Sequence, residues 1–66
     1  MEYTNSQIRE LIEEWIHNDR DRLILSARLI DGWTFEKIAE HMAMSPRHIK
    51  NIVYKLQEQL FKHLPA

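Results

Sequence analysis

One stretch of the chain, Trp33–Lys55, contains enough local signals to constrain its own structure. A helix is predicted over residues 35–42, because apolar residues recur there at helical spacing and Thr34 is a favoured N-cap. Trp33 precedes this cap and Ile38 is the fourth residue inside the helix, which are the two positions of a hydrophobic staple. A polar and an apolar signal therefore agree on where this helix begins.

The same two signals recur a few residues later, at the start of a second helix. Ser45 is placed as the N-cap, and Pro46 occupies the first helical position, where its missing N–H costs nothing. Met44 and Ile49 stand at the staple positions. The turn between the helices is so short that they must pack at a steep angle, with the second helix protruding. This is the helix-turn-helix arrangement, in which the protruding helix enters the major groove of DNA.

An amphipathic helix is predicted nearer the N-terminus, over residues 5–17. It follows a capping box in which Thr4 is the N-cap and Gln7 reaches back to it. Its apolar face consists of Ile8, Leu11, Ile12, Trp15 and Ile16, and its polar face of Arg9, Glu10, Glu13 and Glu14. Because carboxylates repel phosphates, we expect this helix to lie away from DNA.

The next predicted helix, over residues 19–30, is apolar around most of its circumference. Asn18 suits its N-cap, and Gly32 follows its end in the position of a left-handed cap. Its apolar residues are Leu23, Ile24, Leu25, Ala27, Leu29 and Ile30. A helix of this kind is normally buried on several sides, so we expect it to form the centre of the core.

The helix that starts at Pro46 is predicted to continue to about Leu64, where Pro65 ends it. Its inner stripe consists of Ile49, Ile52, Val53, Leu56 and Leu60. Leu60, Phe61 and Leu64 either fold back onto the first helix or form the seam of a homodimer. The dimer is slightly favoured, because a short monomer with one DNA-contacting helix would bind weakly.

Four helices with short connections agree with a composition of one Gly and two Pro in 66 residues. This length allows one domain, residues 1–66, with a small core. The sequence contains no cysteine. No apolar run approaches the roughly 20 residues that span a membrane, and residues 1–10 lack the pattern of a signal peptide. We therefore expect an all-α protein, soluble and cytoplasmic.

Charge is distributed unevenly along the chain. Residues 1–44 contain five Lys/Arg and nine Asp/Glu, a net charge of −4. Residues 45–66 contain four Lys/Arg and one Glu, a net charge of +3. The basic excess begins with the second helix of the motif, which we predict binds double-stranded DNA. Arg47 can pair with a guanine edge and Asn51 with an adenine edge. Further candidate contacts to bases or phosphates are Ser45, His48, Lys50, Tyr54, Lys55 and, across the turn, Lys37.

From Asp21 to Leu64 the sequence DRLILSARLIDGWTFEKIAEHMAMSPRHIKNIVYKLQEQLFKHL resembles region 4 of the sigma-70 family of transcription factors. It is similar, more narrowly, to small region-4-like regulators of bacterial prophages and mobile elements. The output domains of quorum-sensing-type response regulators share the pattern. The resemblance implies DNA binding in bacterial transcription, and contact with RNA polymerase as in sigma factors. One departure is Ala43, where the family usually has Gly; a positive φ there would cost Ala about 1 kcal/mol.

The main alternative is a protein-interaction module that contacts RNA polymerase or another regulator through the acidic first helix. The near-neutral net charge of −1 supports it. The spacing of the four histidines is not that of a metal site, and no cofactor motif or catalytic set is present, so we expect no metal, no cofactor and no enzymatic activity. Trp15 and Trp33 are expected to pack in the core.

Overall fold

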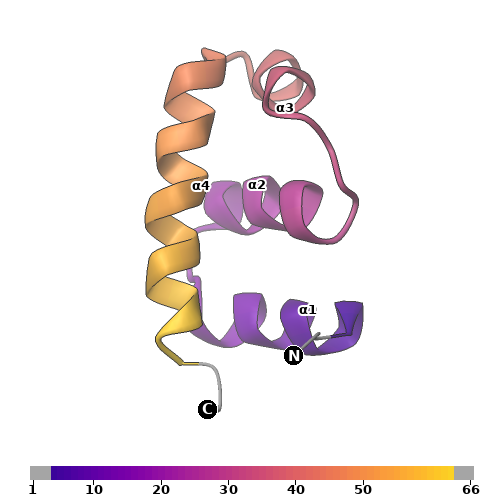
Figure 1. Ribbon diagram of the computed structural model, residues 1–66, viewed down its shortest axis with the longest axis vertical. Coiled ribbons are helices and arrows are strands. Elements are labelled where there is room, and N and C mark those ends of the chain that lie inside the picture. The colour runs from indigo at the N-terminus through magenta and orange to yellow at the C-terminus, as the bar shows by residue number, and fades with distance from the viewer. Residues whose placement is uncertain (1–3, 64–66) are drawn as a thin grey trace.

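The computed structural model describes residues 4–63, which are all-α (Figure 1). The helices are α1 (Asn5–Trp15), α2 (Asp19–Leu29), α3 (Phe35–Met42) and α4 (Pro46–Phe61). The predicted fold class and the order of four helices are confirmed.

A side-chain cap starts every helix, at the residue that the sequence predicts. In α1 the capping box is complete: the Gln7 N–H donates to Thr4 Oγ1 at 3.2 Å, and the Thr4 N–H donates to Gln7 Oε1 at 2.9 Å. The other caps are Asn18, Thr34 and Ser45, which accept from the backbone N–H groups of Asp21, Lys37 and His48. Each cap satisfies an N–H group that has no partner inside its helix.

Three helices end earlier than the sequence predicts. The predicted ends are His17, Ile30 and about Leu64, and the observed ends are Trp15, Leu29 and Phe61. The backbone of Ile16 is extended (φ −109°, ψ 114°), because the chain must already turn toward the cap of α2. Lys62 and His63 form a turn after α4, and Leu64 lies outside the described residues.

Two apolar clusters share α2 and α4. The first core joins α2, α3 and α4 and consists of Ile24, Ala27, Ile38, Ala39, Ile49 and Val53. The second core joins α1, α2 and α4 and consists of Ile12, Ile16, Leu25, Leu56 and Leu60. Ile24 and Leu25 are neighbours on α2, both fully buried, yet they serve different cores. The prediction that α2 lies at the centre of the core is therefore correct.

Two large apolar side chains are more exposed than the sequence predicts. Leu23 is 59% exposed, because α1, α3 and α4 leave one side of α2 uncovered. Trp15 is 36% exposed and stacks on His63 at a centroid distance of 3.6 Å, since it lies at the last residue of α1, on the rim of the second core. Trp33, in contrast, packs against the first core as expected.

The turn between α3 and α4 and the acidic helix α1 lie at opposite ends of the molecule (Figure 1). α4 runs along the long axis, with α3 beside its N-terminal end and α1 beside its C-terminal end (Figure 1). Leu60 is fully buried in the second core, so this residue folds back onto α1, whereas Phe61 is 48% exposed. The acidic helix α1 therefore packs against the C-terminal half of α4 and lies away from the turn between α3 and α4.

Candidate nucleic-acid interface

A left-handed residue forms the turn between α3 and α4. Ala43 has φ 56° and ψ 42°, the conformation that glycine adopts most easily. The Met44 N–H donates to the Ala39 carbonyl at 2.9 Å and the Ala43 N–H to the Glu40 carbonyl at 3.4 Å, which is the pattern of a Schellman motif. Ala43 therefore has the positive φ at which a residue other than glycine is strained.

The first turns of α4 present polar side chains on the face opposite the core. Ile49 and Val53 are fully buried and fix which side of the helix faces inward. Arg47, Asn51 and Tyr54 follow one another at spacings of four and three residues, so they share the outward face. Every candidate contact is exposed: Ser45, Arg47, His48, Lys50, Asn51, Tyr54, Lys55 and Lys37.

Seven of these candidates lie on α4 or at its cap, while Lys37 lies on α3 in a different environment. The Lys37 Nζ is 4.2 Å from the centre of the Trp33 ring, a cation–π contact. His41, one turn further along α3, meets Trp33 edge to face at 5.6 Å. Lys37 and His41 therefore form a separate basic and aromatic group around Trp33.

A stack of two aromatic side chains with a cationic side chain at each end links the outward face of α4 to α3 and α2. Tyr54 meets Phe35 of α3 edge to face, with centroids 6.1 Å apart. The Nζ of Lys50 lies 5.7 Å from the Tyr54 ring, and the guanidinium of Arg28 lies 4.2 Å above the Phe35 ring. Sequence reasoning missed Arg28 and Phe35, because their contacts join three helices and no local spacing signals them.

The basic groups of α4 are free of acidic partners within the described residues. Over residues 4–63 the one ion pair is that of Arg20 and Asp21, at 3.2 Å on α2. Glu58 shares the outward line of Arg47 and Asn51, but it lies two turns beyond Asn51. The exposed basic residues Arg47, Lys50 and Lys55 therefore all precede Glu58 on α4.

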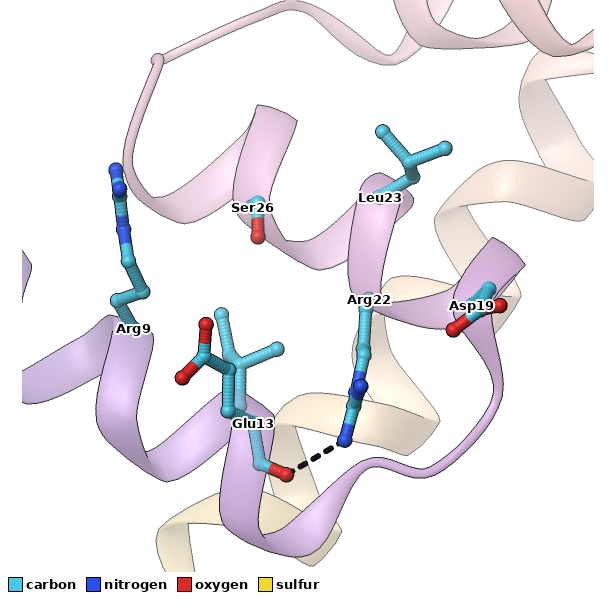
Figure 2. A pocket seen from close by; sticks show the side chains of 7 residues that line it. Arg9, Glu13, Asp19, Arg22, Leu23 and Ser26 are labelled. Atoms are coloured by element: carbon cyan, nitrogen blue, oxygen red, sulfur yellow. Dashed lines mark hydrogen bonds between the residues drawn. The ribbon is translucent and has the colours of Figure 1, made fainter.

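The groove between α1 and α2 is a second candidate for a binding surface. Its charged side chains are of both signs, however, and Arg22 already donates hydrogen bonds within the protein. Arg9, Glu13, Asp19 and Arg22 line it together with Ile12, Leu23 and Ser26. Figure 2 shows Arg22 reaching across to α1, where its Nη2 donates to the Glu13 carbonyl at 2.7 Å and its Nε to the Ile16 carbonyl. Arg22 thus caps the C-terminal end of α1 instead of facing a ligand.

Two further features are absent from the described part of the chain. Residues 4–63 contain no group of three His, Cys, Asp or Glu side chains that could hold a metal ion. None of the helices in this range is both long enough and apolar enough to cross a membrane.

The family model of Sigma-70, region 4 matches residues 18–60, well over half of the chain. The chain belongs to this family. Sigma-70 region 4 is a helix-turn-helix DNA-binding domain connected with transcription, and the resemblance inferred from the sequence is confirmed. The match starts at Asn18, the N-cap of α2, so α1 lies outside it. No curated protein and no solved structure matches the chain.

Proposed function

We propose that this region 4 domain binds double-stranded DNA sequence-specifically through α4 and regulates transcription in bacteria or their phages. One observation carries the proposal: the first turns of α4 expose Arg47, Lys50 and Asn51 opposite a fully buried face. Arg and Asn are the side chains that pair bidentately with guanine and adenine in the major groove. The Ser45 hydroxyl and the Arg47 N–H suit a phosphate at the start of α4. Pro46 has no N–H there, and the His48 N–H already donates to Ser45. The protein would act in the cytoplasm, without a cofactor and without enzymatic activity.

Selection from a random duplex library, followed by affinity measurement on the selected site, tests this proposal. Arg47→Ala is expected to cost about 1–3 kcal/mol of binding free energy and to relax the preference at one base pair. Lys55→Ala is expected to weaken all sequences alike and to lower the salt slope by about 1.

Lys62→Ala is the matched control for these variants. It removes the same charge, but it lies at the far end of α4, so affinity should stay nearly unchanged. Unchanged affinity in Arg47→Ala and Lys50→Ala would refute the proposal. A palindromic selected site would support a homodimer, and a single half-site a monomer.

We infer a second candidate function, protein contact through α1, from the position of this helix. α1 lies outside the family match and at the end of the molecule away from the turn. Glu10, Glu13 and Glu14 are exposed on it. RNA polymerase or another regulator is the expected partner. In a gel-shift series at low salt with mixed genomic fragments, a pure interaction module would give no shift, whereas a DNA-binding domain shifts the fragments.

A further inference from the structure

Phe35 is not among the proposed DNA contacts, but it touches one of them. We propose that Phe35 is a positioning residue for DNA recognition: its ring fixes Tyr54, and Tyr54 holds the ammonium of Lys50. Two groups of the DNA-facing surface are then ordered before DNA arrives. This inference rests on the proposed function, because it concerns the same face of α4.

The ring of Phe35 is itself firmly held. Phe35 is the first residue of α3, directly after the Thr34 cap, and its half-buried ring packs against the first core. The guanidinium of Arg28 covers the ring at 4.2 Å. Arg28 is fixed in turn, because its Nη1 donates to the Trp33 carbonyl at 2.9 Å. Phe35 therefore forms a rigid base for the part of the stack that lies on α4.

Tyr54 and Lys50 need such a base because they are exposed. Tyr54 is 54% exposed, and the edge-to-face contact with Phe35, at an interplanar angle of 84°, restricts its rotamers. The electron-rich face of the phenol ring then attracts the Lys50 ammonium, which lies one turn before it. A lysine loses much rotamer freedom when it is immobilised on a phosphate or a base, and a side chain that is already ordered loses less.

This ordering distinguishes Lys50 from Arg47 and Asn51, the other candidate contacts with bases on the first turns of α4. Within residues 4–63, no side-chain hydrogen bond or ion pair holds Arg47 or Asn51. The contribution of Phe35 to DNA affinity should therefore be transmitted through Lys50 and Tyr54, and not through Arg47. This selectivity separates a positioning role from a general loss of stability.

A double-mutant cycle on the selected duplex tests the inference. With Lys50 present, Phe35→Leu should weaken binding about two- to fivefold, the size expected for losing an exposed cation–π arrangement. In the Lys50→Ala background, Phe35→Leu should have a clearly smaller effect, because only the part that acts through Tyr54 remains. Phe35→Tyr keeps the ring and should retain the wild-type affinity. Equal losses in the two backgrounds, or no loss in either, would overturn the inference.

Two further measurements keep the test decisive. Tyr54→Leu removes the middle of the stack at an exposed position, so it should reproduce the loss even if Phe35→Leu folds poorly. In the free protein, the ring current of Tyr54 should shift the NMR signals of the Lys50 side chain upfield, and Phe35→Leu should reduce that shift. An unchanged shift overturns the inference without any reference to DNA. Failure of the wild-type protein to bind any duplex would instead overturn the proposed function.

Discussion

Replacing Ala43 by glycine should stabilise the protein, although the change removes a methyl group and adds no new contact. Ala43 has φ 56°, and a left-handed conformation costs a non-glycine residue about 1–2 kcal/mol. Glycine relieves this strain but lowers stability by about 0.4–1 kcal/mol, because it gives the unfolded chain more freedom. Ala43 is exposed, so the lost methyl group leaves no cavity. The net gain is about 0–1.6 kcal/mol with a central value of about 0.8 kcal/mol, which is equivalent to a rise in Tm of about 3–6 °C for a domain of this size.

Urea unfolding followed by far-ultraviolet circular dichroism measures this gain, with an unchanged m-value as a requirement. Gly32→Ala is the matched control. Gly32 has φ +72°, and an added Cβ would meet nothing within 4 Å, so the change introduces strain without a clash. It should lower the free energy of unfolding by about as much as Ala43→Gly raises it. If Gly32→Ala destabilises while Ala43→Gly has no effect or destabilises, the strain assigned to the turn is wrong.

Two other predictions concern the second core and the groove beside it. Arg22→Met removes the donors to two carbonyls at the end of α1. The free energy of unfolding should therefore fall by about 1–2 kcal/mol. Amide hydrogen exchange should become faster in α1 but not in α3. Equal acceleration in both helices would contradict the capping role. Leu23→Ser should change stability by less than about 0.5 kcal/mol in urea unfolding, whereas Leu25→Ala should cost about 2–5 kcal/mol. A large loss at Leu23 would contradict its exposed position.

Local signals were sufficient to predict where the helices begin. Thr34 and Ser45 act through hydrogen bonds to residues three positions ahead, so the sequence alone contains both partners. The inner stripe of α4 could be predicted for the same reason, because helical periodicity determines which residues share a face. The whole set of candidate contacts on α4 is exposed as expected. Whether these residues bind DNA stays a prediction.

Tertiary contacts explain what the sequence could not supply. Arg22 replaces a local cap at the end of α1 by reaching from another helix, and nothing in the pattern of residues 13–17 indicates this. The exposure of Leu23 depends on how far three neighbouring helices extend around α2. Trp15 has the helical spacing of a core residue, but it is the last residue of α1 and therefore lies at the edge of the second core. The contact of Phe35 with Tyr54 likewise depends on the angle between α3 and α4.

The division of α4 between two cores has a consequence for how this protein can evolve. Ile49 and Val53 anchor the N-terminal half of α4 to α3, while Leu56 and Leu60 anchor the other half to α1. Substitutions in α1 act on α4 mainly at Leu56 and Leu60, which lie about 13 Å or more along the helix from Arg47, while Ile52 packs against both cores. Selection can therefore change the surface of α1 for new partners while the N-terminal end of α4, which contains Arg47, keeps its position relative to α3. One helix can in this way accumulate changes under two sets of constraints that meet at Ile52.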